Sequence, residues 1–368
     1  MKIIFASLVF LSTALSASDH TVNVFLIGPG GVGSELINQV RANFSADEKV
    51  EIRLVGLANS RKMVFDEKGL DLTHWKGALE NSSEKMASDQ FVEKMVNLHL
   101  PHSVFVDCSS NQGMANLYPQ VLESSIAVVT PNKKANSGPY LQYKALQEIS
   151  EKTKVPFLYD ANVGAGLPII HVIKGIKRAG DSVTKLEAIL SGTLSYLFNT
   201  YDGTKPFSEL LKEAQQKGYT EPDPRDDLNG LDMARKFLIL ARESGLELEV
   251  SDITIEPFIS QESFAAANVE DFYQRLAQED DAFLKLVKQA KEEQKVLRFI
   301  GVLENGKATL SLQLVGQDHP FYSLSDTDNI VSIRSKVYSK TPIVIKGPGA
   351  GTKVTASNVL RNILEAGL

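Results

Sequence analysis

The sequence predicts an α/β protein in which a doubly wound parallel sheet is followed by a second α+β domain with a mixed or antiparallel sheet. Its 368 residues are enough for two domains with separate cores. The front half begins with an apolar strand, a glycine-rich turn and a helix, and further apolar strands follow. The rear half contains strand-like segments joined by an Asn-Gly turn, which indicates antiparallel pairing. We expect the first domain over residues 21–155 and the second over residues 156–350.

The composition excludes several classes of protein. Apolar residues make up 43% of the chain and charged residues 23%, which are ordinary values for a globular protein. The net charge of −6 and the lack of a basic block argue against a nucleic-acid partner. The single cysteine, Cys108, rules out an internal disulfide framework and a multi-cysteine zinc site. A small molecule is therefore the expected partner.

The first twenty residues, MKIIFASLVFLSTALSASDH, differ from the rest of the chain. A lysine, an apolar run and the small residues ALSA are typical of a secretory signal over residues 1–17, and the run is too short to suit a membrane span. The alternative is an extension in front of a cytosolic domain. The chemistry of the remaining chain favours a cytoplasmic enzyme.

The segment at residues 21–40, TVNVFLIGPGGVGSELINQV, predicts a strand, a glycine turn and a helix. Gly28, Gly30 and Gly33 have the G-x-G-x-x-G spacing of a Rossmann-like dinucleotide site. The first glycine permits the tight bend, the second lets the backbone approach the pyrophosphate, and the third lets the helix pack close to the strand. The turn from Gly28 to Ser34, which includes Gly31 and Val32, is thus predicted to bind the cofactor phosphates at the helix N-terminus.

A second strand, EIRLVGLAN, ends at Asn59, where NAD enzymes often carry an acidic residue for the ribose. Asn59 is followed by Ser60, Arg61 and Lys62, which suit a 2′-phosphate better. The sequence therefore favours NADP over NAD, with Asn59 and Arg61 as cofactor residues. The alternative is that Arg61 and Lys62 are only solvated surface charges.

Two more apolar strands, within residues 103–110 and 126–135, end in polar residues. Ligands of doubly wound sheets bind beyond the carboxyl ends of the strands, so we expect Ser109 and Lys133 to face the cofactor or the substrate. Lys133 could also be an ordinary surface lysine. Residues 157–170, FLYDANVGAGLPII, predict a strand and a glycine-rich loop that either holds a cation through its carbonyls or only crosses between domains.

The stretch GYTEPDPRDDLNGLDMARK, from Gly218 to Lys236, is unusually rich in charge. Its prolines predict an extended loop, and Asp226 or Asp227 would cap a helix that continues to Gly245. The apolar residues of this helix leave almost no polar side, which predicts that it is buried.

Asp232 and Lys236 are four residues apart and so lie on one face of that helix. Buried charges are costly unless they are paired or used. One interpretation is an ion pair that fixes packing. The other is a carboxylate and an ammonium facing a cleft, where Glu221 and Asp227 add negative charge for a substrate ammonium group.

The last hundred residues predict a charged helical region from about 270 to 294 and four antiparallel strands. Two of these strands meet at Asn305-Gly306, a strong hairpin signal. This sheet is a plausible contact between subunits, so we expect a homodimer or a higher homo-oligomer. Finally, GPGAGTKVTASNVLRNIL forms a second glycine turn and a helix, with residues 351–368 returning to complete the first domain.

Together the motifs GYTEPDPRDDLNGLDMARK, TPNKKA, VGAGLP, SGTLSYLFN and GPGAG make the chain resemble homoserine dehydrogenase, above all the dehydrogenase half of bifunctional aspartokinase/homoserine dehydrogenases. The resemblance spans residues 22–368. It implies NAD(P)-dependent interconversion of L-aspartate 4-semialdehyde and L-homoserine, on the path to threonine and methionine.

The resemblance also implies roles for individual residues. Glu221 and Asp232 would hold the amino end of the substrate, and Lys236 and Lys133 would serve the reacting oxygen. Gly28 through Ser34, Ser109 and Gly351 would line the cofactor. A monovalent cation such as Na⁺ would be held by Asp160, Val163, Ala165 and Leu167.

Two other functions stay open on the sequence alone. A cysteine-dependent semialdehyde dehydrogenase would use Cys108 as its thiolate nucleophile. A non-catalytic dinucleotide sensor would need the glycine turn but would have no use for Asp232 and Lys236.

Overall fold

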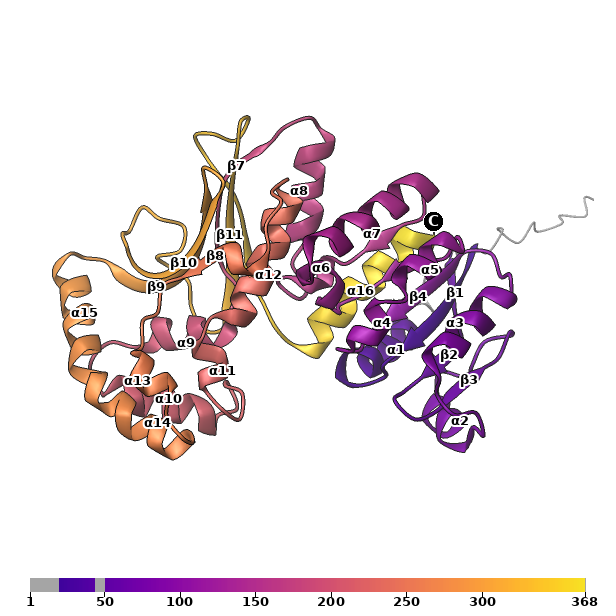
Figure 1. Ribbon diagram of the computed structural model, residues 1–368, viewed down its shortest axis with the longest axis horizontal. Helices are drawn as coiled ribbons and strands as arrows, with labels where there is room; N and C mark the ends of the chain where they lie inside the picture. The colour runs from indigo at the N-terminus through magenta and orange to yellow at the C-terminus, as the bar shows by residue number, and fades with distance from the viewer. Residues whose placement is uncertain (1–19, 44–49, 368) are drawn as a thin grey trace, which may run out of the picture.

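The structure is a computed structural model that describes residues 20–43 and 50–367. These residues form two lobes, with the N- and C-terminal parts of the chain in one lobe and most of the rear half in the other (Figure 1). The signal-like segment predicted at residues 1–20 lies almost entirely outside the described residues. No helix in the described ranges has both the length and the apolar character needed to cross a membrane.

The first lobe is built on a six-stranded sheet in the order β3-β2-β1-β4-β5-β6. Five strands are parallel and β3 runs antiparallel at one edge. The strands are β1 (His20–Ile27), β2 (Val50–Ala58), β3 (Met63–Phe65), β4 (Ser103–Asp107), β5 (Ala127–Val129) and β6 (Phe157–Leu158). The order reverses at β1, where β2 and β4 lie on its two sides, so the predicted doubly wound sheet is confirmed.

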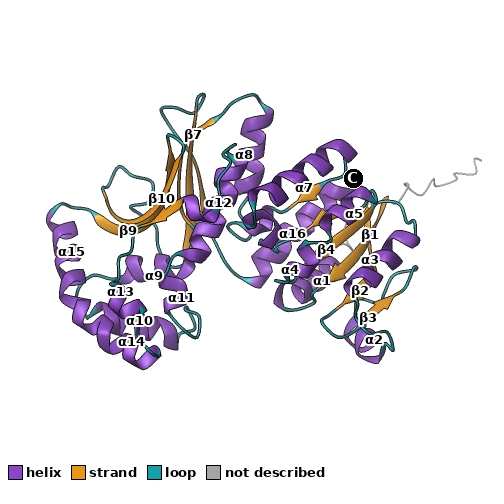
Figure 2. Ribbon diagram, in the orientation of Figure 1, coloured by secondary structure: helices purple, strands orange, loops and turns teal. Residues whose placement is uncertain are grey.

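Helices cover both faces of this sheet (Figure 2). They are α1 (Gly31–Asn43), α2 (Trp75–Asn81), α3 (Ser88–Asn97), α4 (Gln112–Ala115), α5 (Tyr118–Glu123), α6 (Lys134–Ser137), α7 (Tyr140–Thr153) and α16 (Thr352–Gly367). Leu36, Ile37 and Val40 of α1 are buried with Val359 and Ile363 of α16 in one apolar core. The C-terminal helix thus packs beside the first helix of the chain, because both bury an apolar stripe on the same face of the sheet.

The first sheet extends past the boundary that we expected at residue 155. β6 pairs in parallel with β5 through Val128–Phe157 and Val129–Leu158, so it belongs to this sheet. The short 3-10 turn η1 (Asp160–Asn162) follows directly and leads into the second lobe. The chain therefore crosses between the lobes at the glycine-rich loop, a few residues later than the pattern change in the sequence suggested.

The second lobe contains a mixed sheet in the order β12-β11-β7-β9-β10-β8. Its strands are β7 (Val183–Ile189), β8 (Ile253–Ile255), β9 (Val296–Glu304), β10 (Lys307–Val315), β11 (Asp328–Ser335) and β12 (Ile343–Pro348). All neighbours are antiparallel except β8 and β10. The predicted hairpin joins β9 and β10 at Asn305 and Gly306, whose φ angles of 51° and 74° fit a type I′ turn.

The sequence did not reveal β7 and β8 as members of this sheet. β7 lies in its middle, between β11 and β9. Its partners are more than a hundred residues away along the chain, as in the pair Leu186–Leu303, and such pairing leaves no local signal.

The helices of this lobe are α8 (Ile169–Arg178), α9 (Gly192–Thr200), α10 (Phe207–Gln216), α11 (Arg225–Leu228), α12 (Leu231–Glu243), α13 (Gln261–Phe264), α14 (Val269–Leu276) and α15 (Asp280–Glu292), with the 3-10 turns η2 (Val250–Asp252) and η3 (Ala277–Glu279). α12 lies on the side of the lobe that faces the first domain (Figure 1). It contacts both α6 and α8, so it is an element of the junction between the lobes.

The helix predicted from Asp226 or Asp227 to Gly245 is in fact two helices. α11 begins at Arg225 after Pro224 and ends at Leu228, and α12 begins at Leu231. Gly230 lies between them with a φ of 71°, which a right-handed helix does not allow. The break also leaves Leu231 43% exposed, so this residue is not part of the buried side that we expected.

Candidate active site

The glycine turn joins β1 to α1 and forms one wall of the cofactor site. Gly28 has a φ of 84°, and its N–H donates to the Ala58 carbonyl at the end of β2. A Cβ on Gly28 would lie 2.8 Å from the Ser109 nitrogen, so β1 and the loop after β4 approach too closely for a side chain here. Gly33 allows a second close approach, since its Cβ would lie 2.4 Å from the Gly28 carbonyl oxygen. The N-terminus of α1 is therefore held directly over the turn.

A cavity of about 1110 Å³ opens at the carboxyl ends of β1, β2 and β4. Five of the predicted cofactor residues line it, namely Gly28, Gly30, Ser34, Asn59 and Ser109. This is the edge of the sheet at the reversal of strand order, where doubly wound proteins bind dinucleotides.

The other predicted cofactor residues are not part of the cavity lining, namely Gly31, Val32, Gly33, Arg61, Lys133 and Gly351. Gly31 and Val32 are the first residues of α1, and Val32 packs toward the apolar core. A Cβ on Gly31 would lie 2.9 Å from the Thr352 methyl, so the Gly351 turn at the start of α16 lies beside the glycine turn between β1 and α1.

Asn59 shapes the turn after β2. Its Oδ1 accepts hydrogen bonds from the N–H groups of Arg61 and Lys62, both at 2.8 Å. The ammonium of Lys62 donates to the Glu80 carbonyl at 2.5 Å, whereas Arg61 is exposed. The Lys62 ammonium is therefore engaged by a carbonyl of the protein, and only Arg61 of this pair is free to reach a ligand.

Lys133 follows a buried polar network at the ends of β4 and β5. Asp107 accepts from the Tyr118 hydroxyl at 2.6 Å and from the Asn132 amide at 2.9 Å. The Asn132 amide also donates to the carbonyl of Asn111, which lines the cavity. Burial strongly raises the pKa of Tyr118, and the Asp107 carboxylate adds to this, so the hydroxyl stays a donor. Lys133 is thus placed next to the cavity by a fixed segment.

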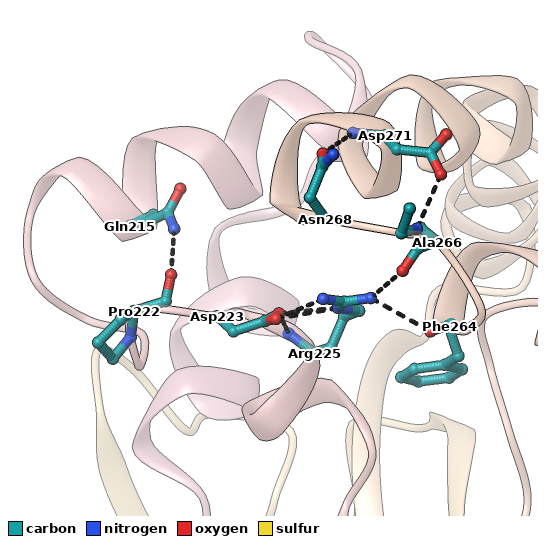
Figure 3. Close-up of polar contacts among 9 residues, drawn as sticks. Gln215, Pro222, Asp223, Arg225, Phe264, Ala266, Asn268 and Asp271 are labelled. Atoms are coloured by element: carbon teal, nitrogen blue, oxygen red, sulfur yellow. Dashed lines mark hydrogen bonds and ion pairs between the residues drawn. The ribbon is translucent and has the colours of Figure 1, made fainter.

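The charged residues of the segment before α12 have two different roles. Arg225 forms a fork to Asp223 and donates to the carbonyls of Ala266 and Phe264 (Figure 3). Figure 3 also shows Gln215 donating to the Pro222 carbonyl. These contacts fasten the loop to α10 and to the segment before α14, so Asp223 and Arg225 serve the fold and leave the remaining carboxylates for the site.

Asp232 connects two lysines that come from different lobes. Its Oδ1 accepts from the Lys133 ammonium at 2.5 Å, and its Oδ2 accepts from the Lys236 ammonium at 2.8 Å. Lys236 also donates to the Leu190 carbonyl at 3.0 Å, at the end of β7. The side chain of Asp232 is 52% exposed and that of Lys236 only 17%, so the cluster lies at the edge of the protein interior with one open side.

The electrostatics of this cluster keep Asp232 ionised. Burial opposes its charge, but the ammonium groups of Lys236 and Lys133 outweigh burial and hold the pKa of Asp232 well below its usual range. Burial and the charge of Lys236 lower the pKa of Lys133, and the Asp232 carboxylate only partly offsets them. A lysine whose pKa is lowered is better suited to exchange a proton near neutral pH.

Asp227 of α11 and Glu221 of the loop before α11 lie beside this cluster. Asp227 accepts from the Thr193 hydroxyl at 2.8 Å and from the Glu221 N–H at 2.7 Å. Burial raises the pKa of Asp227, the Asp232 carboxylate adds to this, and the two hydrogen bonds oppose it. The Asp227 contacts thus hold the loop, whereas Glu221 is exposed and its carboxylate is available to a ligand.

Of the predicted cation ligands, Asp160 lies in η1, and Val163, Ala165 and Leu167 lie in the glycine-rich loop that follows. Ala165 has a φ of 52°, and its carbonyl accepts from the Asn358 amide of α16 at 2.7 Å. The buried Asp160 carboxylate accepts from the Asn362 amide at 2.7 Å and lies 3.5 Å from Arg361. Side chains of α16 thus bond both the Ala165 carbonyl and the Asp160 carboxylate, which fixes the loop against this helix.

Sequence reasoning missed two groups of residues. Leu190 directly follows the end of β7, and its carbonyl accepts from Lys236; Thr193 lies in the first turn of α9 and donates to Asp227. Neither contact could be predicted without the position of β7 in the middle of its sheet. The cavity is also lined by Trp75, Lys76 and Leu79 of α2, by Ser88 of α3, and by Met86 between these helices. No motif pointed to them.

The doubly wound sheet, its glycine turn and the cavity at the carboxyl ends of the strands are those of a dinucleotide-binding protein, and the Lys133, Asp232 and Lys236 cluster lies at the junction of the two lobes. A family model described as homoserine dehydrogenase matches residues 168–364, and one described as its NAD binding domain matches residues 28–160. The chain therefore belongs to the homoserine dehydrogenase family. The predicted resemblance and the NAD(P)-binding domain are confirmed.

Similar proteins support this membership. The chain is 42% identical to bifunctional aspartokinase/homoserine dehydrogenase 1 of Arabidopsis thaliana over 95% of its own length but only 39% of that protein. It is 36% identical to homoserine dehydrogenase of Schizosaccharomyces pombe, over 95% of this chain and 96% of that one. The chain thus spans about two fifths of the bifunctional relatives it matches.

Solved structures show the same fold. A Candida auris protein of unknown function has a TM-score of 0.88 and 37% identity, with 94% of this chain and 98% of that chain covered. A putative homoserine dehydrogenase from Archaeoglobus fulgidus has a TM-score of 0.74 at 22% identity, over 94% of this chain and 98% of that one.

The two alternative functions are not favoured. Burial, aided by the Asp107 carboxylate, raises the pKa of the Cys108 thiol far above its ordinary value, which disfavours the thiolate that a nucleophile needs. A sensor has no need of the Lys133, Asp232 and Lys236 cluster, and the family is one of dehydrogenases.

Proposed function

We propose that this protein is a homoserine dehydrogenase that interconverts L-homoserine and L-aspartate 4-semialdehyde with NAD(P). The observation that carries the proposal is the Lys133, Asp232 and Lys236 cluster, which joins the cofactor lobe to the second lobe. The substrate is small and carries an ammonium, a carboxylate and a reacting oxygen. The cluster and Glu221 offer charges of both signs to such a molecule.

A dinucleotide held by the glycine turn and the other residues of the cavity would supply or accept the hydride. In the reduction, an ammonium donates its proton to the oxygen of the aldehyde as negative charge develops there, and in the oxidation the neutral amine takes the proton back. We assign this role first to Lys236 and second to Lys133. Asp232 and Glu221 accept hydrogen bonds from the amino group of the substrate, and Asp227 holds the loop that presents Glu221.

NADP is the proposed cofactor. The residue after β2 is Asn59, which brings no negative charge to oppose a 2′-phosphate. Ser60 and Lys76 line this part of the cavity, and Arg61 is exposed next to Ser60. A hyperthermophilic archaeal homoserine dehydrogenase that is 22% identical to this chain has been solved in complex with NADPH.

The first test is the initial rate of L-homoserine oxidation by protein that begins at Ser18, with NADP and NAD at matched concentrations. We expect turnover with both and a preference for NADP that declines in Arg61→Ala, because this change removes a charge near the 2′-phosphate. The exposed Arg41→Ala on α1 is the control. Folded protein that binds NADP but turns over with neither cofactor would contradict the proposal.

A monovalent cation is proposed at Asp160, Val163, Ala165 and Leu167. The loop connects the lobes, so an ion there would stabilise the junction. We expect the thermal midpoint to rise when Na⁺ replaces tetramethylammonium at constant ionic strength, and the rise to be smaller in Asp160→Asn. An equal midpoint in the two salts would refute the site.

We further propose that the protein is a homo-oligomer that works in the cytoplasm. The mixed sheet offers exposed apolar residues near its β12 edge, namely Val337, Tyr338 and Val344. Light scattering after size exclusion would show a monomer if the first proposal is wrong. Fractionation of expressing cells would find the protein outside the cytoplasm if the second is wrong.

A further inference from the structure

The two candidate proton donors lie on opposite lobes. Lys133 precedes α6 of the cofactor lobe, and Lys236 is part of α12 of the second lobe. Their common partner Asp232 also belongs to α12, so the contact between Lys133 and Asp232 crosses the junction. The relative position of α6 and α12 therefore decides whether the cluster forms.

The C-terminal end of α12 carries a buried arginine that contacts α6. Arg242 has a fully buried side chain, and its NH1 donates to the Asn136 carbonyl at 2.8 Å. The rest of the guanidinium donates to the Leu248 carbonyl at 2.8 and 3.0 Å and to Glu249 at 3.1 Å. Because the fork is planar and rigid, it ties α6 to α12 at a defined distance and angle.

Asn136 transmits this contact to Lys133. It lies three residues after Lys133 in the single turn of α6, where the Ser137 N–H and hydroxyl both donate to the Lys133 carbonyl. The Asn136 amide donates to Asn162 at 2.8 Å, and the Asn162 amide donates to the Thr130 carbonyl at 2.9 Å. A shift of Asn136 would therefore move Lys133.

The next residue of α12 makes a second connection across the junction. The buried Glu243 accepts from the Tyr143 hydroxyl at 2.8 Å and from the Tyr159 hydroxyl at 2.5 Å. Tyr143 belongs to α7 and Tyr159 follows β6, so both donors come from the cofactor lobe. Glu249 adds a third connection, since it accepts from the Tyr140 N–H at 2.8 Å.

We propose that Arg242 and Glu243 are positioning residues, which hold α6 against α12 so that Lys133 reaches Asp232 and Lys236. This inference rests on the proposed function. It assigns to the buried charges a role in the geometry of the site, in addition to the stability of the junction. Two buried charged residues, each bonded to the cofactor lobe, are a suitable device, because their hydrogen bonds have a fixed direction, whereas apolar packing tolerates sliding.

The first test is Arg242→Lys, which keeps the charge and loses the fork. We expect kcat for homoserine oxidation to fall about 10- to 100-fold, because small misplacements of a catalytic group have effects of this size. The KM for NADP should stay unchanged, since the cavity residues lie on the cofactor lobe. A KM that rises while kcat is kept would overturn the inference.

A double-mutant cycle separates positioning from general loosening. If Arg242 acts through Lys133, adding Arg242→Lys to Lys133→Ala should cause little further loss of kcat. Additive losses would show that Arg242 acts elsewhere and would overturn the inference. If Arg242→Lys does not fold, Tyr159→Phe can replace it in the cycle. This change removes one of the two hydroxyls that donate to Glu243, and we expect a smaller loss of kcat.

A second readout does not depend on turnover. Competitive acetylation over a range of pH, read by mass spectrometry, reports the pKa of Lys133 in the folded protein. Burial and Lys236 lower that pKa in the wild type, so release of Lys133 in Arg242→Lys should raise it toward the value of an ordinary lysine. An unchanged pKa of Lys133 would overturn the inference, even if the wild type proved to lack homoserine turnover.

The matched control is Arg298→Lys. Arg298 is a buried arginine of the second lobe that donates to the carbonyls of Phe198, Phe321 and Tyr322, away from α6. Its loss should lower the thermal midpoint and leave both kcat and the pKa of Lys133 near the wild-type values. If both variants lowered kcat equally, the loss of any buried arginine would be enough to reduce turnover, and the positioning role of Arg242 would be refuted.

Discussion

Replacing Lys236 by alanine should lower kcat about 10²- to 10⁴-fold, the usual contribution of general acid–base catalysis. Lys236 bonds Asp232 at 2.8 Å and the Leu190 carbonyl at 3.0 Å, so its ammonium is held at one place in the cluster. Alanine removes the proton donor and leaves Asp232 with Lys133 alone. Steady-state kinetics of homoserine oxidation with NADP would measure the loss, and circular dichroism would show that the fold is kept.

Two comparisons make this result specific. Lys212→Ala, on the exposed side of α10, should leave kcat unchanged. Lys133→Ala should also reduce kcat, and the larger of the two losses identifies the main proton donor. Near-normal turnover of folded Lys236→Ala would show that Lys236 is not that donor, and the role would then pass to Lys133.

Replacing Gly33 by alanine should destabilise the protein by about 1–3 kcal/mol, the usual cost of overpacking. The new Cβ would lie 2.4 Å from the Gly28 carbonyl oxygen, and neither backbone atom can move without separating α1 from β1. Alanine favours a helix over glycine by only about 0.5–1 kcal/mol, so the clash decides the sign. Urea unfolding would measure the loss, and NADP titration should show weakened binding.

Gly30→Ala is the control in the same turn. A Cβ there meets nothing within 4 Å, so the stability should be close to that of the wild type. We nevertheless expect weaker NADP binding, because Gly30 is the position where the backbone approaches the pyrophosphate. If both variants lost stability equally, the close contact between Gly33 and Gly28 would not be what requires glycine.

Local patterns predicted the parts of the fold whose causes are local. The glycine turn at Gly28 and the hairpin at Asn305-Gly306 need backbone conformations that few residues adopt, so their sequences identify them directly. The sequence pattern also predicted the apolar stripe of α1, and Leu36, Ile37 and Val40 are buried as expected. The break at Gly230 was missed because the apolar residues continue on both sides of it.

Long-range pairing explains the remaining errors. β7 and β8 join a sheet whose other strands lie far along the chain, and β6 extends the first sheet beyond the expected boundary. Of the charged motif, the sequence did not separate Asp223 and Arg225, which fasten the loop, from Asp232 and Lys236, which form the cluster. These roles depend on partners such as Ala266 and Lys133, which are distant in sequence.

The sequence by itself determined the family, the order of the two domains and the residue types available for catalysis, because these follow from short motifs and their spacing. Only the tertiary structure decided which of those residues meet. Lys133 lies 99 residues before Asp232, yet its Nζ is 2.5 Å from the Asp232 Oδ1, because α6 and α12 pack across the junction. Contact between such distant positions results from burial and hydrogen bonding summed over both lobes, and no local pattern encodes it.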